Sequence, residues 1–280
     1  MDLVPEDVIV RAPSPVVSTR LQLLDKIIAV LDALAQHPGA RLPDVTRLTG
    51  IPKPTCHRLL QSLVHRHLLW RDGPHYYAGA RLAWYAATVW RADGLAHRAR
   101  PALRALAEAT DLGAVLVRRA EGFRVTVAVA GRPDRIRAAW GAGQIGVVYA
   151  GATGKVLLAW LERHVRDEVL SQVPFRRLTP RTPPSREALE RDLAVVRAHG
   201  WALTWGERET ETFALAAPVF DERGETAAVS LAGHVARYRD ACLAQWARML
   251  WETGRALSRL STGEYPAFRP PGPGPRPARF

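Results

Sequence analysis

The sequence predicts an α+β fold with a winged helix-turn-helix near the N-terminus. Apolar residues recur at helical spacing over 18–66, turn signals divide them into three helices, and a hairpin pattern follows. Beyond residue 111, short strand patterns are grouped with helices but do not alternate with them regularly. That grouping is typical of an antiparallel sheet with packed helices rather than of a doubly wound parallel sheet.

The first helix is predicted from its apolar stripe. Ser18 and Thr19 are candidate N-caps, because hydroxyl side chains accept hydrogen bonds from the free N–H groups of a first helical turn. Pro38-Gly39 ends the pattern, since neither residue continues a helix readily. The side chains expected to face inward are Leu21, Leu24, Ile27, Ile28, Leu31 and Leu34.

Two further helices and a hairpin complete a predicted N-terminal domain over 18–80. Helices are expected over about 42–49 and 53–66, separated by the terminating Gly50 and a tight turn. Asp72-Gly73 then divides two short β-prone runs, as in a hairpin. Helix, turn, helix and hairpin in this order predict a winged helix-turn-helix, whose second helix enters the major groove of DNA.

The rest of the ordered chain is predicted to contain linker helices over 81–110 and a domain over 111–262 that mixes strands and helices. Residues 1–17 and 263–280 are proline-rich and lack apolar periodicity, so we expect a disordered arm and a disordered tail. Strands are expected near 114–117, 123–129, 135–140, 201–206, 212–219 and 225–235, and helices near 152–161 (with more helix to about 171), 185–199 and 239–260.

Composition limits the class of protein. A length of 280 residues favours two domains, and a net charge of +12 fits a nucleic-acid partner. No apolar run is long enough for a transmembrane helix, and the acidic, proline-broken start does not resemble a secretory signal. Cys56 and Cys242 lie far apart, so neither a disulfide framework nor a zinc module is expected. We therefore expect a cytoplasmic protein with no cofactor, no metal and no membrane partner.

The third predicted helix and the hairpin carry the candidate DNA contacts. Free N–H groups at a helix start favour phosphate, and Arg58 can pair bidentately with guanine or bind a phosphate. Arg71 and His75 of the hairpin are candidates for the adjacent DNA backbone or the minor groove, and Arg20 is a candidate N-terminal arm. The alternative is that these charges are only solvated. The candidates in the helix are Lys53, Pro54, Thr55, His57 and Arg58.

Two patterns that resemble catalytic motifs do not support an enzyme. The run Gly-Ala-Thr-Gly-Lys at 151–155 resembles a phosphate-binding loop, but Tyr149 and Val156 stand where such a loop needs glycine and a hydroxyl residue. Nucleotide hydrolysis is therefore disfavoured. Three alternating acids are interpreted as a solvated rim of like charges rather than as acid–base groups: Glu207, Glu209 and Glu211.

Over roughly 18–262 the sequence resembles the IclR family of bacterial regulators (isocitrate lyase regulator type). The resemblance implies a winged helix-turn-helix, a linker helix and a C-terminal GAF-like effector-binding domain. It also implies dimers or tetramers on palindromic operator DNA, with repression as the usual outcome. The motifs that carry the resemblance are STRLQLLDKIIAVLDAL, LPDVTRLTGIPKPTCHRLLQSLVHRHLLWRD, YYAGARL, AGATGKVLLAW, LTPRTPPSREALERDLAVVRAHGWAL and FALAAPVFDERGETAAVSLAG.

The resemblance further implies that a small organic effector, often a carboxylate or aromatic acid, binds the second domain. Its pocket would lie at the start of the AGATGK helix, whose backbone N–H groups suit a carboxylate, and on the two strands after Gly200. This sequence departs from the family pattern there, since Thr204 replaces an acidic residue of some members and Ala214 a common cysteine. Glu211 also stands where glycine is usual. The alternative is a second domain that serves oligomerisation only. The candidate effector-binding residues are Ala152, Thr153, Gly154, Thr204, Ala214 and Trp140.

Overall fold

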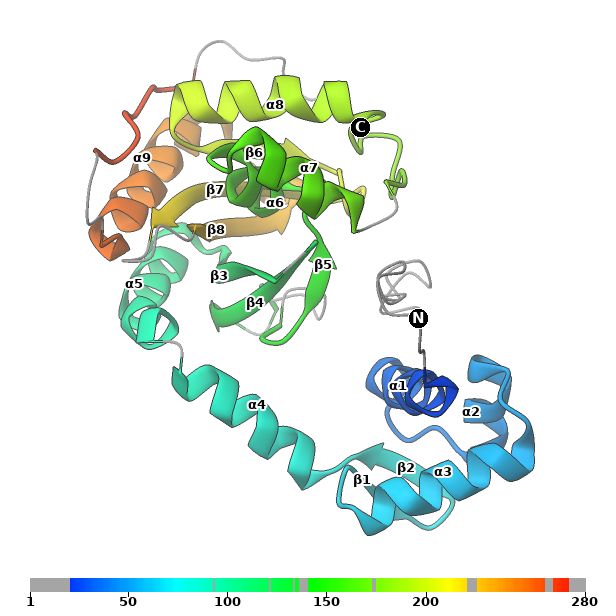
Figure 1. Cartoon of the computed structure of the whole chain (residues 1–280). Coiled ribbons are helices and arrows are strands. Elements are labelled where there is room, and N and C mark those ends of the chain that lie inside the picture. Colours follow the sequence, from blue (N-terminus) through cyan, green and yellow to red (C-terminus); the bar gives the residue numbers. More distant parts are fainter. Residues whose placement is uncertain are drawn as a thin grey trace. The chain divides into compact units, whose positions relative to one another are not determined.

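The computed structural model describes residues 21–92, 94–120, 122–132, 134–135, 141–172, 175–220, 226–259 and 264–271. The chain divides into two compact units between residues 93 and 94 (Figure 1). Each unit has its own buried cluster of apolar side chains, so each can be described separately.

The N-terminal unit is a helix-turn-helix followed by a hairpin and one further helix, so the predicted winged helix-turn-helix is confirmed. Its core draws on the first three helices and both strands, with Val30, Leu60 and Tyr76 among the buried side chains. In chain order the elements are α1 (Gln22–Gln36), α2 (Leu42–Thr49), α3 (Lys53–His65), β1 (Leu69–Asp72), β2 (His75–Ala78) and α4 (Ala80–Ala92).

Helix α1 differs from its prediction at its start and on its faces. Its N-cap is Leu21, which makes no side-chain cap hydrogen bond, so the prediction of Ser18 or Thr19 as the cap is wrong. The predicted apolar stripe is also wider than the buried face, because only one side of α1 contacts the neighbouring helices. Leu21, Leu24 and Ile28 are 68%, 55% and 46% exposed, whereas Leu34 is 1% exposed.

The start of α4 is held against the end of α3 by backbone hydrogen bonds. The N–H of Gly79 donates to the carbonyl of Leu68 at 2.8 Å, and that of Arg81 donates to the carbonyl of His67 at 3.1 Å. A Cβ on Gly79 would lie 2.4 Å from the His67 carbonyl oxygen, so this approach requires glycine. Within this unit α4 therefore leaves α3 in a fixed direction.

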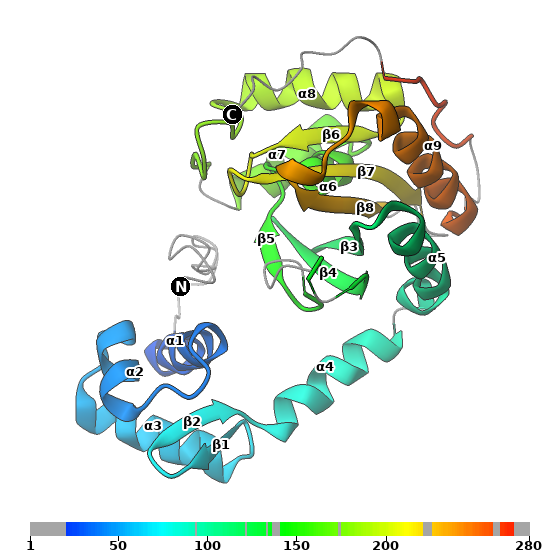
Figure 2. The same cartoon turned by 180° about the vertical axis from the view of Figure 1, so that it is seen from behind.

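The C-terminal unit is a six-stranded antiparallel sheet in the order β5-β4-β3-β8-β7-β6. Helices α5 and α9 pack on one face of the sheet, and α6 and α8 pack on the other (Figures 1 and 2). The α+β prediction is therefore confirmed. The elements are α5 (Gly94–Thr110), β3 (Gly113–Ala120), β4 (Phe123–Ala130), β5 (Ile145–Val147), α6 (Ala152–Ala159), α7 (Arg163–Ser171), α8 (Arg186–His199), β6 (Ala202–Trp205), β7 (Thr212–Phe220), β8 (Thr226–His234), the 3-10 turn Val235–Arg237 and α9 (Asp240–Leu257).

Two parts of this unit differ from expectation. The short strand β5 was not predicted, and most of the strand expected near 135–140 lies outside the described residues. The prediction of a disordered tail from residue 263 is wrong for residues 264–271, which pack against the C-terminal unit. There Tyr265 donates its hydroxyl to the carbonyl of Pro218 at 2.6 Å, and the Trp251 indole donates to the carbonyl of Pro266 at 2.8 Å. Composition alone misses such partners, because they come from distant elements.

Helix α6 reaches its position through a glycine. A Cβ on Gly154 would lie 2.1 Å from the carbonyl oxygen of Val148, which belongs to the backbone and cannot move aside easily. We expect Gly154→Ala to lower the free energy of unfolding of the C-terminal unit by about 3 kcal/mol through overpacking. Urea unfolding followed by circular dichroism measures the change.

The matched control for this prediction is Gly94→Ala. A Cβ on Gly94 would meet only the flexible end of Arg98, at 3.5 Å, and the residue begins helix α5. Its unfolding midpoint should stay close to that of the wild type. Equal midpoints for the Gly154 and Gly94 variants would contradict the packing argument.

Candidate DNA interface and ligand cavity

The exposed start of α3 forms the first candidate site. Leu59 and Leu60 are buried and fix the helix on its core, so the opposite face is left to solvent. Of the predicted DNA contacts, Lys53, Pro54 and Arg58 are exposed, whereas Thr55 and His57 are half-buried. Cys56 is fully buried, and burial raises the pKa of its thiol, so this cysteine is a packing residue.

The backbone at the start of α3 offers donors as well as charge. Its N-cap is Pro52, which makes no side-chain cap hydrogen bond, and Pro54 has no N–H. The N–H groups of Lys53 and Thr55 lie in the first turn, where an α-helix supplies no acceptor. The start of α3 therefore has two N–H groups without a helical acceptor, an exposed Lys53 in the same turn and an exposed Arg58 in the next, which suits it to a phosphate.

The predicted hairpin contacts are exposed but already make contacts within the unit. His75 Nδ1 lies 2.8 Å from the carbonyl oxygen of Gly39, so its imidazole joins the hairpin to the loop before α2. The Arg71 guanidinium donates to the carbonyl of Gly73 and lies 5.8 Å from the ring centroid of Tyr76. Arg20 lies outside the described residues.

A cavity of about 50 Å³ forms the second candidate site. Its lining comes from strands β3, β4, β6, β7 and β8, from the start of α6 and from the loop 206–209. Of the predicted effector residues, Gly154 packs against Val148 instead of lining the cavity, and Trp140 lies outside the described residues. The predicted residues that do line it are Ala152, Thr153, Thr204 and Ala214.

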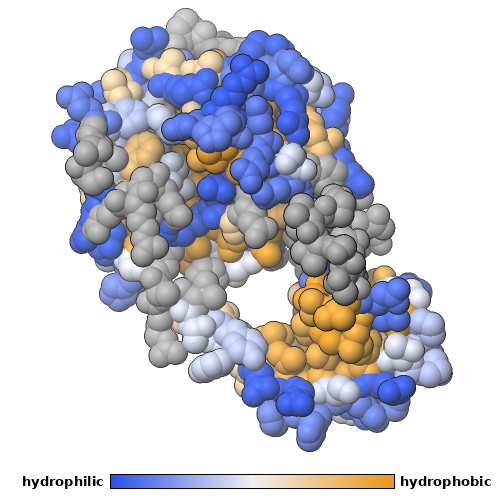
Figure 3. Space-filling model, in the orientation of Figure 1, coloured by the Kyte–Doolittle hydropathy of each residue, from blue (hydrophilic) through white to orange (hydrophobic). Residues whose placement is uncertain are grey.

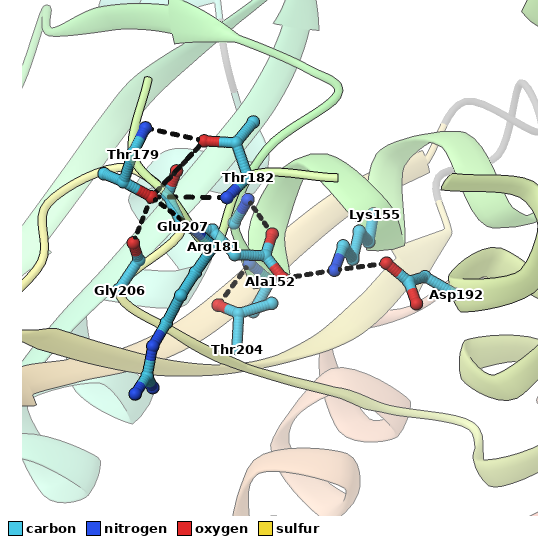
Figure 4. A network of polar contacts seen from close by, with 10 residues as sticks. Ala152, Lys155, Thr179, Arg181, Thr182, Asp192, Thr204, Gly206 and Glu207 are labelled. Carbon is cyan, nitrogen blue, oxygen red and sulfur yellow. Dashed lines mark hydrogen bonds and ion pairs between the residues drawn. The ribbon is translucent and has the colours of Figure 1, made fainter. Parts of the chain in front are cut away.

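Two N–H groups at the start of α6 already have acceptors within the protein. The N–H of Gly151 donates to Glu207 Oε2 at 2.9 Å, and that of Ala152 donates to Thr204 Oγ1 at 3.0 Å (Figure 4). Glu207 also accepts from Lys155, whose ammonium contacts Asp192 Oδ2 at 2.8 Å. The expectation that Ala152 offers a free N–H to a ligand is therefore wrong, because residues from distant strands and loops cap this helix.

Glu207 is a buried member of this network rather than part of a solvated rim. Its side chain is only 10% exposed, and burial raises its pKa although the charge of Lys155 opposes the shift. The loop that carries it is held by two hydroxyl groups, since Thr179 donates to the Gly206 carbonyl at 2.6 Å and Thr182 to that of Glu207 at 2.7 Å. The interpretation of Glu207 as solvated is wrong, whereas Glu211 is indeed exposed, at 68% of its side chain.

Arg124 and Arg208 also line the cavity, and the sequence reasoning missed both. Burial lowers the pKa of each guanidinium, and at Arg124 the charge of Arg208 adds to the effect. The only sign in the sequence is that one arginine, Arg124, interrupts the apolar strand FRVTVAVA. A side chain that faces solvent would give the same pattern. Only the pairing of β4 with β5 puts that arginine inside.

Two protein-family models match the sequence and show to which family the chain belongs. Residues 23–73 match the IclR helix-turn-helix domain, and residues 87–259 match the C-terminal domain of the bacterial transcriptional regulator IclR. The chain belongs to the IclR family. IclR-family proteins are transcriptional regulators that bind DNA, so this chain is a regulator and not an enzyme, as the sequence predicted.

Individual relatives support the IclR assignment over most of the chain. The HTH-type transcriptional regulator BhcR of Paracoccus denitrificans is 31% identical and covers 85% of this chain and 86% of its own length. XynR of Escherichia coli is 29% identical over 85% of this chain and 96% of its own length. The crystal structure of an IclR-type regulator from Alicyclobacillus acidocaldarius covers 86% of this chain and 98% of its own, with 24% identity and a TM-score of 0.71.

Among the residues that the structure describes, no helix is long and apolar enough to cross a membrane. Among the same residues, no three histidine, cysteine or acidic side chains gather closely enough to bind a metal ion.

The capping of α6 by Thr204 can be tested directly. Thr204→Val keeps the side-chain shape but leaves the buried N–H of Ala152 without an acceptor, which we expect to cost about 1–3 kcal/mol of unfolding free energy. Thr88→Val is the control, because it removes an exposed helix hydroxyl that donates to Tyr85, and it should change stability by less than about 0.5 kcal/mol. If both variants unfold at the same urea concentration, the cap contributes nothing.

Proposed function

We propose that this IclR-family regulator acts in the cytoplasm as a repressor that binds a palindromic operator as a dimer or tetramer. A small organic effector, bound in the cavity beside α6, changes its affinity for DNA. The observation that carries the DNA-binding part is the exposed, basic start of α3, where free backbone N–H groups and cationic side chains meet.

We propose distinct roles for the DNA contacts. The N–H groups of Lys53 and Thr55 bind phosphate, and Arg58 reaches a base edge or a second phosphate from the next helical turn. Pro54 packs against the DNA backbone, and His57 adds a polar contact beside Arg58. Arg71 and His75 bring the hairpin to the adjacent DNA backbone, with Arg20 as an arm.

Self-association is supported by apolar side chains left uncovered in the N-terminal unit. Ile28 of α1 joins the exposed Leu21 and Leu24 at its start, and Trp84 and Tyr85 of α4 are 58% and 45% exposed. Figure 3 shows apolar surface gathered over α1. Large exposed apolar side chains that lie together mark interaction surfaces. We propose that a second copy covers them, which places two α3 helices in successive major grooves about 34–36 Å apart.

Effector binding is supported by the cavity and by two comparisons. An IclR homolog from Microbacterium hydrocarbonoxydans was solved with 4-hydroxybenzoate, and the PobR inducer-binding domain from Acinetobacter with 3-hydroxybenzoic acid. A cavity of about 50 Å³ holds only a few water molecules. A ligand as large as a hydroxybenzoate therefore requires the residues that line the cavity to move apart. We propose that the ligand contacts Ala152, Thr153, Thr204 and Ala214, with Gly154 and Trp140 as further candidates.

The role of Arg58 is tested by fluorescence anisotropy on the intergenic DNA upstream of the protein's own gene. Arg58→Ala should weaken specific binding by about 1–3 kcal/mol, which is roughly five- to 150-fold, because a bidentate base contact is lost. Arg163→Ala is the control, since this arginine of α7 is 89% exposed and lies in the other unit. Equal affinities for the two variants would remove Arg58 from the interface, and absence of binding to any fragment at low salt would contradict the proposed function.

If an effector controls DNA binding, the binding of the effector and the binding of operator DNA must be coupled. A compound that binds the cavity should change operator affinity by about five- to 150-fold, and operator DNA should change the compound's affinity by the same factor. Thermal unfolding and anisotropy on the full chain measure the two sides. If no compound changes either the melting temperature or the operator affinity, the second unit serves oligomerisation only.

A further inference from the structure

Arg124 holds a positive charge inside the cavity without acceptors for all of its donors. The residue is 3% exposed, and its Nε and Nη2 atoms have no hydrogen-bond acceptor among the described residues. A guanidinium stays protonated even where burial opposes its charge. A buried ion with unpaired donors is costly, and natural structures compensate such a group with an opposite charge.

Arg124 lines the cavity from strand β4 and packs against the neighbouring strand β5. Arg124 and Thr126 alternate along β4 and line the cavity together. The guanidinium lies against Gly146 of β5, where any Cβ would be 2.8 Å from Nη2, so the glycine makes room for it. Nε and Nη2 form one edge of the guanidinium, and such an edge binds both oxygens of a carboxylate.

The charges around the cavity favour an anion at this end. Arg208 adds a second cation, and Glu209 is the acidic side chain whose charge favours the ionised form of both arginines. Glu207 is committed to Lys155 and to the N–H of Gly151. The two arginines therefore share the charge of this one carboxylate, and an anionic group beside Arg124 would lower the cost of burying its guanidinium.

Part of the start of α6 is unavailable to the same anion. Thr204 and the carboxylate of Glu207 already accept the N–H groups of Ala152 and Gly151, and Glu207 would repel a second negative charge. We propose that the effector carries one anionic group, such as a carboxylate, that Arg124 binds through Nε and Nη2 with Arg208 alongside. This inference rests on the proposed effector-binding function and adds a strand side chain to the ligand contacts that the family resemblance implies.

Arg124→Met and Gly146→Ala test the proposal in the full-length protein. Without ligand, Arg124→Met removes an uncompensated buried charge and should raise the melting temperature by about 2–4 °C. The probes are acetate and 4-hydroxybenzoate, each paired with its neutral amide at constant ionic strength. At least one carboxylate should raise the wild-type melting temperature while its amide does not, and Arg124→Met should weaken binding of that carboxylate at least tenfold.

Gly146→Ala keeps the charge but displaces the guanidinium, so it should weaken the carboxylate response with little change in the ligand-free melting temperature. Arg163→Met, at an exposed position of α7, should respond as the wild type does. The proposal is overturned if amides and carboxylates act alike in the wild type, or if no carboxylate raises its melting temperature. It is equally overturned if Arg124→Met lowers the ligand-free melting temperature and keeps the carboxylate response.

Operator anisotropy with the same compounds separates this inference from the function on which it rests. If a neutral amide changes operator affinity and Arg124→Met does not alter that effect, effector sensing stands and anion recognition is wrong. If carboxylates bind through Arg124 but never change operator affinity, anion recognition stands and effector sensing is wrong.

Discussion

The contact on which the C-terminal unit most depends is the burial of the first turn of α6 against strand and loop backbone. Gly154 allows the helix to reach Val148, and Thr204 and Glu207 then accept its first free N–H groups. Lys155 fixes the same turn to α8 through Asp192. Sheet, loop and both helices therefore meet at one helix end, and the cavity is the space that remains beside it.

The two units use the same structural device in opposite ways. At α3 the helix start is exposed, has no side-chain cap and carries basic residues, so its donors are available to an external partner. At α6 the helix start is buried, and the N–H groups of Gly151 and Ala152 are used within the protein. Among the described side chains that line the cavity, Arg124 on a strand carries the donors without an acceptor.

Local signals were enough to predict most elements but few of the contacts at the cavity. Gly50 and Gly200 end their helices with positive φ angles, and Ser185 caps α8, as their sequence positions indicate. The placement of Arg124 and Glu207 depends on strand pairing and on a loop 52 residues from Lys155, and no local pattern records these. The position of the segment 264–271 also could not be predicted locally, since its hydrogen-bond partners belong to the distant elements β7 and α9.

The hydrogen bonds between Gly79, Arg81 and the end of α3 have a mechanical consequence. Because α4 begins in contact with the backbone of His67 and Leu68, its N-terminal end cannot rotate freely against the helix-turn-helix. A torque applied along α4 must therefore turn the helix-turn-helix as one rigid body, instead of being absorbed as a local bend. In the complex that we propose with DNA, the angle of α3 in the groove then depends on how the far end of α4 is held.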